Sequence, residues 1–131
     1  MKITNMTIEE IINVLNDTNS FRNNVDIKIP AKIRFAIRVN EGKINELYKA
    51  YTEERVTLLK DYVDDGRATI EDNKIKVLPD YIPEANKELI ELSNIENDVD
   101  FQTIDKETMD EFLGTVSLSV PEERILLMFV D

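Results

Sequence analysis

Residues 31–63, AKIRFAIRVNEGKINELYKAYTEERVTLLKDYV, decide the fold of this chain. Positions alternately four and three apart run through the whole stretch, and six of the nine are apolar: Ile33, Ile37, Asn40, Ile44, Leu47, Tyr51, Glu54, Leu58 and Asp61. This heptad spacing places the nine positions on one face of a helix. It predicts a single helix of about nine turns.

The start of this stretch also fits a strand. Ile33, Phe35, Ile37 and Val39 alternate with polar or small residues, as in a half-buried strand. Gly42 would then mark a turn. We prefer the helix because a glycine inside a helix costs only about 1 kcal/mol.

The apolar stripe has two possible roles. It can form the core of one subunit, packed against helices before and after it, or it can be the seam of an oligomer. In an oligomer, the polar residues Asn40 and Glu54 would fix the register. We favour burial within the subunit, because a chain of this size needs its longest helix for its core.

Local signals predict the remaining elements. Thr7 with Glu10, and Ser119 with Glu122, match capping boxes at helix starts, and Gly66 fits a left-handed helix end. The expected elements are a helix over 7–17, a strand-like stretch over 25–29, a hairpin over 68–77, a helix over 83–94, a strand over 98–104 with Val99, Phe101 and Thr103 inward, a helix over 106–113, and a last helical turn or two that contains the apolar run 125–130.

Together these elements predict an α+β fold that is mostly α. A long central helix packs with two or more shorter helices and a small antiparallel sheet or hairpin. The length of 131 residues and the 42% of hydrophobic residues suit a single domain over 1–131. No apolar run is long enough to span a membrane, and the opening residues lack the apolar segment of a signal peptide. We therefore expect a cytoplasmic protein.

Charge is unevenly distributed along the chain. Residues 1–50 carry eight Lys/Arg and six Asp/Glu, a net of +2, whereas residues 51–131 carry eight and 21, a net of −13. Such an acidic surface disfavours direct binding of nucleic acid and suits a basic protein partner, although solubility alone also explains it. The candidate protein-binding residues are acidic: Asp64, Asp65, Glu71, Asp72, Asp98 and Asp100.

Side chains for common catalytic chemistry are missing from the sequence. There is no histidine and no cysteine, so the usual general base, thiol nucleophiles and soft-metal sites are absent. Residues 61–72 resemble a calcium loop, but Val63 occupies a ligand position and Asp72 replaces the bidentate glutamate. We expect no enzyme activity, no metal and no cofactor.

Basic residues cluster in the first half of the chain. Lys32, Arg34, Arg38 and Lys43 are candidates for an anion-binding patch, with Lys28 nearby. They can hold a phosphate ligand or pair with the chain's own acidic half, and we favour the second interpretation.

The layout resembles that of small uncharacterised accessory proteins of phages and prophages of Gram-positive bacteria. The similarity lies in the Met-Lys-Ile opening with its Thr-capped helix, the Ile29-Pro30-Ala31-Lys32 entry to the long helix, residues 50–55 and 58–62 within it, the acidic hairpin, the Glu88-Leu89 helix and the Ser119-x-Pro-Glu turn. It covers nearly the whole chain, and it implies an accessory protein without catalytic activity.

Three functions follow from these observations. The first is a phage-encoded acidic protein that binds and inhibits a host protein, such as a component of a defence system. The second is a virion assembly or scaffold protein that oligomerises through the 31–63 helix. The third is a sponge for a nucleotide signal, held near the basic patch. The expected partner is a host or phage protein, and a homo-oligomer is possible.

Overall fold

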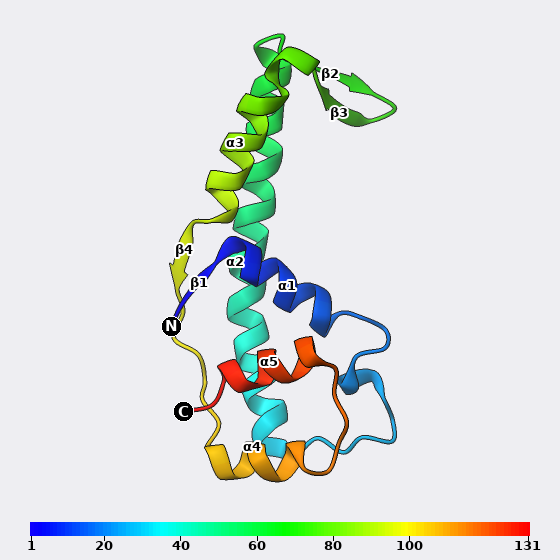
Figure 1. The fold of residues 1–131 in the computed structure, drawn as a ribbon, viewed down its shortest axis with the longest axis vertical. Helices are drawn as coiled ribbons and strands as arrows, with labels where there is room; N and C mark the ends of the chain where they lie inside the picture. The colour runs from blue at the N-terminus through cyan, green and yellow to red at the C-terminus, as the bar shows by residue number, and fades with distance from the viewer.

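A computed structural model describes all residues from 1 to 131. Its dominant element is helix α2, Ala31–Asp64, which runs uninterrupted along the long axis of the molecule (Figure 1). The predicted long helix is therefore confirmed, and the strand alternative at its start is wrong. The mostly helical α+β fold is also confirmed, with shorter helices and two small antiparallel sheets around α2.

The first half of α2 lies inside a compact base. Helices α1 (Asn5–Leu15), α4 (Lys106–Leu113) and α5 (Val120–Met128) and the short 3₁₀ turn η1 (Phe21–Asn23) surround it. Ile33, Ile37 and Ile44 of the heptad stripe belong to the main core, which has 18 buried residues. This part of the stripe is covered within the chain, so it offers no open seam to a second copy.

The second half of α2 extends out of the base. Helix α3 (Ile82–Ser93) lies beside it, preceded by the 3₁₀ turn η2 (Pro79–Tyr81), and the hairpin of β2 (Ala68–Glu71) and β3 (Lys74–Val77) forms the tip (Figure 1). We call residues 51–95 the arm. The arm has its own small core of Tyr62, Ala68 and Ala85.

The end of α2 and the hairpin follow from local sequence. Gly66 has φ +74. Its N–H donates a hydrogen bond to the carbonyl of Val63, and the N–H of Arg67 donates one to the carbonyl of Tyr62. These two bonds form a Schellman motif, so Gly66 is the predicted left-handed cap. Asp72 and Asn73 have φ 52 and 63, as a two-residue type I′ hairpin turn requires.

The other small sheet joins distant parts of the chain. Strand β1 (Lys2–Thr4) pairs antiparallel with β4 (Glu96–Asp98), directly beside the base of α3. The strand predicted over 98–104 is wrong in position, although Val99 and Phe101 are buried as expected. Thr103 is exposed, and the next residue, Ile104, is buried and forms a single bridge to Val130.

Two further local predictions differ from the structure: the strand-like stretch 25–29 is wrong, and the first helix is present but begins two residues earlier than predicted. Residues 25–29 form a turn and an irregular segment, because no other strand lies beside them to pair with their alternating pattern. Helix α1 begins at Asn5 with Thr4 as its cap, and Thr4 Oγ1 accepts from the Thr7 N–H at 3.2 Å. Thr7 is thus inside the helix, because the β1–β4 pairing fixes the chain up to Thr4. No helix of the structure has the length and apolar character needed to cross a membrane.

The predicted capping box of α5 is confirmed and does more than cap. Glu122 accepts hydrogen bonds from the N–H and hydroxyl of Ser119, and at 2.7 Å it also accepts the N–H of Phe21 in η1. Burial alone would raise the pKa of Glu122, but these hydrogen bonds hold it below its usual value. One carboxylate therefore joins the start of α5 to the loop that follows α1.

Asn40 is the polar residue of the stripe that lies wholly inside the base. Its side chain is fully buried, donates to the carbonyl of Gln102 at 3.0 Å, and accepts the N–H of Gln102 at 2.7 Å. The extended segment after β4 has no strand partner at this point, so the amide side chain satisfies its backbone instead. Asn40 thus attaches α2 to the segment around Gln102 within one chain. The sequence had predicted that Asn40 would set the register of an oligomer if the stripe were a seam.

Replacing Asn40 by Ala should lower the free energy of unfolding by about 2–4 kcal/mol, because the N–H and carbonyl of Gln102 lose their partner and a small cavity remains at a fully buried position. Chemical denaturation measures this. The exposed Asn45→Ala on the same helix is the control and should change stability by less than about 0.5 kcal/mol. Sedimentation should show no change of oligomeric state, and a change would restore the register interpretation.

Replacing Glu122 by Ala should cost about 1–2 kcal/mol at neutral pH. Because the pKa of Glu122 is lowered by folding, its contribution is present above the ordinary value of 4.5 and is lost as pH falls further. The difference between the two proteins in denaturation should therefore shrink on acidification. Glu123→Ala, one residue away, removes a side chain that accepts no hydrogen bond and should change stability at neutral pH by less than about 0.5 kcal/mol.

Candidate functional site

The six acidic candidates from the sequence lie in two separate places. Four of them, Asp64, Asp65, Glu71 and Asp72, gather around the tip of the arm and are exposed. Asp65 pairs with Arg67 at 2.8 Å, and Glu71 with Lys76 at 3.7 Å. Asp98 and Asp100 lie beyond the other end of α3, which is about 18 Å long. The six residues therefore do not form one surface.

A groove between α2 and α3 lies between these two places. Its floor consists of Leu58, Leu92 and Ile95, and its rim consists of Glu54, Glu88 and Glu91. The volume is about 320 Å³, and no third helix covers it. We call it the arm groove. From the sequence, Glu54 was predicted only as a polar position of the stripe. No local pattern in the sequence marks the groove, because α2 and α3 bring its residues together only in the folded chain.

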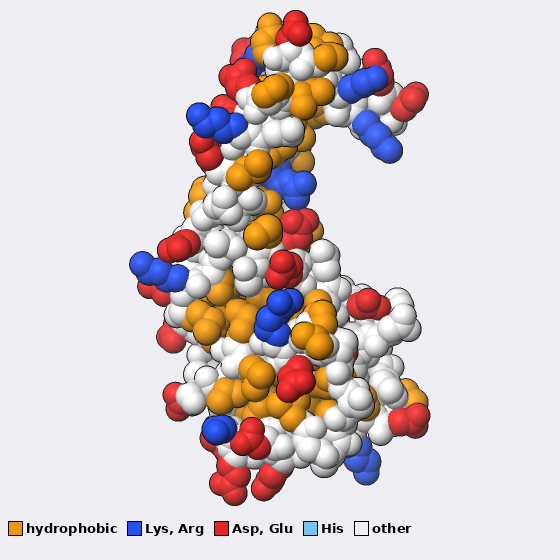
Figure 2. Space-filling model, viewed as in Figure 1, with side chains coloured by type: hydrophobic (Ala, Val, Ile, Leu, Met, Phe, Trp, Pro, Cys, Tyr) orange, Lys and Arg blue, Asp and Glu red, His pale blue; other side chains and the backbone are white.

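Apolar side chains remain exposed along the whole arm. Two helices cannot bury all of each other's apolar face, and Figure 2 shows orange side chains scattered over the arm between charged ones. The large exposed apolar residues of the arm are Val56, Ile70, Tyr81, Ile82, Ile90 and Ile95. Ile90 and Ile95 of the α3 region are 58% and 50% exposed, which is high for a helix face that packs on a neighbour.

The arm is acidic overall. Residues 51–95 hold eleven Asp/Glu and six Lys/Arg, a net of −5. Some of the basic side chains are engaged within the arm: Arg67 pairs with Asp65 and with Glu84 at 2.9 Å, and Lys76 pairs with Glu71. Glu54 and Glu91 on the groove rim have no ion-pair partner in the chain. The rim therefore presents unneutralised carboxylates.

Tyr62 ties α3 to α2 near the end of the arm. Its ring is buried under the Arg67 guanidinium, 3.8 Å from the ring centre, and its hydroxyl donates to Glu88 Oε2 at 2.6 Å. Burial, the bond to Glu88 and the charges of Glu84 and Glu88 raise the pKa of Tyr62 to about 12, against the opposing effect of Arg67. A tyrosine with a raised pKa is a poor base at neutral pH, so this contact holds the groove in shape and does not point to catalysis.

The four basic candidates divide between two sides of α2. Lys32 lies 4.0 Å from Asp105, and the Lys43 ammonium bonds the carbonyl of Asp100, so both are engaged within the chain. The side chains of Arg34 and Arg38 are exposed and make neither an ion pair nor a hydrogen bond within the chain. The predicted pairing with the acidic half therefore holds for one member, Lys32, while the two arginines remain free.

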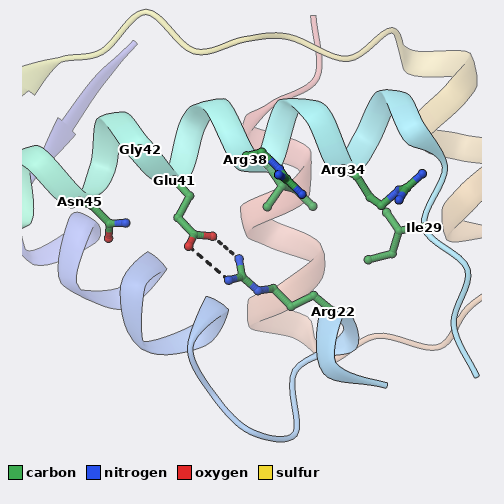
Figure 3. Close-up of a pocket in the computed structure, with 8 residues that line it drawn as sticks. Arg22, Ile29, Arg34, Arg38, Glu41, Gly42 and Asn45 are labelled. Atoms are coloured by element: carbon green, nitrogen blue, oxygen red, sulfur yellow. Dashed lines mark hydrogen bonds and ion pairs between the residues drawn. The ribbon is translucent and has the colours of Figure 1, made fainter. Parts of the chain in front are cut away.

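Arg34 and Arg38 line a second groove, on the base. The loop after α1 brings Arg22 and Ile29 against α2 there, and Figure 3 shows Arg22 reaching Glu41 while Arg34 and Arg38 follow on successive turns. Arg22 and Glu41 form a two-point ion pair, and this bond raises the pKa of Arg22 although burial opposes it. We call this the arginine groove; its volume is about 520 Å³. Arg22 was not predicted from the sequence, because it is close to the others only in the folded chain.

Gly42 also lines the arginine groove, inside α2. A glycine in a helix interior costs about 1 kcal/mol relative to alanine. A Cβ added at Gly42 would meet no atom within 4 Å, so packing within the chain does not require this glycine. The bare backbone is left open toward the groove.

No family model matches this chain, and no curated protein or solved structure shows a detectable similarity to it. The two grooves are therefore interpreted from their own geometry. Neither brings together a nucleophile and a base. Both suit binding: the arm groove a basic apolar segment, the arginine groove an anion.

Alkaline pH should loosen the arm before it affects the base. The pKa of Tyr62 is about 12 in the folded chain and ordinarily 10.0, so its stabilising contribution is complete below pH 10 and falls as pH rises toward 12. Ultraviolet titration of tyrosinate should show one of the four tyrosines ionising late, and Tyr62→Phe should remove that late step. Late ionisation that persists in the Tyr62→Phe protein would contradict this assignment.

Proposed function

We propose that this chain is a non-enzymatic binding protein that holds a basic protein partner along its arm. The observation that carries the proposal is the arm groove, whose apolar floor is uncovered and whose rim is acidic. An apolar strip between two helices is the usual acceptor for the apolar face of a third helix. The carboxylates of Glu54 and Glu91 select Lys and Arg at the edges of that face.

The partner segment that fits best is an amphipathic helix with apolar residues on one face and basic residues flanking them. Docking would place its apolar residues over Leu58, Leu92 and Ile95 and would complete a three-helix layer in the arm. The acids at the tip, Asp64 and Asp72 among them, lie outside the groove. They would contribute mainly to long-range attraction and the rate of association, which falls with salt.

The resemblance to phage accessory proteins supports a host protein as this partner, and inhibition of it as the outcome. An arm that covers a basic amphipathic helix would prevent that helix from binding its own target. The scaffold alternative relies on the heptad stripe as a seam. Burial of Ile33, Ile37 and Ile44 within the base favours the partner-binding proposal over it.

A designed helical peptide of known composition tests the proposal directly. A peptide with Leu on one face and Lys on its flanks should bind in fluorescence anisotropy, whereas the same peptide with Glu in place of Lys should not. Reversing the rim with Glu54→Lys and Glu91→Lys should weaken binding of the basic peptide at least about tenfold, because two attractive charges become repulsive. Ile95→Ser should weaken it by removing part of the floor.

Two matched control variants distinguish an effect of the groove from a general effect of changing the protein's charge or surface hydrophobicity. Glu46→Lys with Glu53→Lys makes the same change of charge on exposed positions of α2 outside the groove. Ile90→Ser makes the same change as Ile95→Ser on an exposed position outside the groove floor. Both should bind the basic peptide within about threefold of the unmodified protein. Equal losses in these controls, or binding of the acidic peptide, would contradict the proposal.

A further inference from the structure

We propose that the arginine groove is a binding site for a nucleotide, a phosphate ester that carries a flat apolar group. The site is on the base, so it is distinct from the arm groove and does not depend on the partner proposed above. Its ligand would be held by Arg34 and Arg38, with Arg22 as a third, fixed guanidinium.

Arg34 and Arg38 are isolated cations in an acidic protein. The chain has 27 Asp/Glu side chains, yet none forms an ion pair with either arginine. Like charges four residues apart on a helix repel each other. An anion between the two side chains removes this repulsion, and guanidinium groups bind phosphate oxygens with paired hydrogen bonds.

Arg22 is held in a fixed position at the same groove. A guanidinium has five N–H donors, and Glu41 takes two of them, one from each terminal nitrogen. Three donors therefore remain on a side chain whose orientation is already set. Because Glu41 neutralises the charge of Arg22, the net positive charge of the groove comes from Arg34 and Arg38. This arrangement favours a ligand with one or two negative charges.

The uncharged parts of the groove suit the rest of such a ligand. Ile29 and Ile37 give the groove an aliphatic wall, and Asn45 adds one amide that can donate and accept hydrogen bonds. A volume of about 520 Å³ lies within the range of small-molecule sites. Inorganic phosphate alone would not contact this wall, whereas the nucleobase of a nucleotide would lie against it.

Gly42 keeps one side of the groove clear. The chain itself does not fill the space that a Cβ would occupy there, so the glycine leaves the α2 backbone open to a ligand. A side chain at this position would narrow the groove and strengthen the helix at the same time. Gly42→Ala should therefore stabilise the free protein and weaken the bound state, a combination that a purely structural glycine does not give.

The experiment is titration calorimetry, supported by thermal shift, with AMP, a 3′,5′-cyclic nucleotide, inorganic phosphate and adenosine as probes. We expect one or both nucleotides to bind, phosphate to bind at least about tenfold more weakly, and adenosine not to bind. Arg34→Gln with Arg38→Gln should weaken nucleotide binding at least about tenfold, because each charged hydrogen bond contributes roughly that factor. Gly42→Ala should raise the melting temperature of the free protein by about 3 °C and reduce the affinity.

The matched control is Lys32→Gln with Lys43→Gln, which removes the same charge from the other side of α2. It should leave nucleotide affinity within about threefold. The proposal is overturned if neither nucleotide binds at millimolar concentration, if phosphate binds as tightly as the nucleotides, or if the lysine control loses as much affinity as the arginine variant. Peptide binding to the arm groove should be unchanged by Arg34→Gln with Arg38→Gln, so the two sites are tested separately.

Discussion

The length of α2 is the constraint on which the rest of the structure depends. A helix of 34 residues is about 50 Å long, whereas a compact sphere of 131 residues is roughly 36 Å across. One core cannot enclose such a helix. The chain therefore builds its main core around the first half of α2 and covers the second half with a single helix, α3 (Figure 1). The apolar strip of the arm remains uncovered because only one helix packs on this half of α2. The proposed partner would bind to this strip.

Because the arm has so little core, hydrogen bonds hold α3 in its middle and at its C-terminal end. At the C-terminal end of α3, the side chain of Asn5 donates a hydrogen bond to the carbonyl of Leu92 at 2.8 Å and accepts one from the Asn97 side chain at 2.9 Å. In the middle of α3, Glu88 accepts a hydrogen bond from the Tyr62 hydroxyl. Both attachments are at residues that line the arm groove, Glu88 and Leu92, so the α3 wall of the groove is positioned before any partner arrives. A groove that is already formed spares the partner the entropy of ordering it.

Local signals in the sequence predicted the elements that depend on residues close together in the chain. They failed for elements whose structure depends on contacts between distant segments. The long helix, the Gly66 cap, the hairpin and the Ser119 capping box were all predictable, since each is fixed by residues a few positions apart. The pairing of β1 with β4 joins residues more than ninety positions apart, and no local pattern in the sequence predicts it. At its far end the stripe continues through Tyr62, which is buried, whereas Asp61 of the exact seven-residue repeat is exposed. The reason is that a straight helix turns about 20° per heptad away from such a repeat.

The same uninterrupted helix also decides how the two candidate sites relate to each other. The arginine groove uses residues 34–45 of α2, and the arm groove uses Glu54 and Leu58 farther along it. Allosteric coupling needs an element with two alternative arrangements that both ligands bias. Between the two grooves, α2 has no break and no proline, and Tyr51 is buried against its neighbours. A rod of this kind holds the sites at a fixed separation and transmits no switch. We therefore expect the proposed nucleotide on the base and the proposed partner on the arm to bind as independent events.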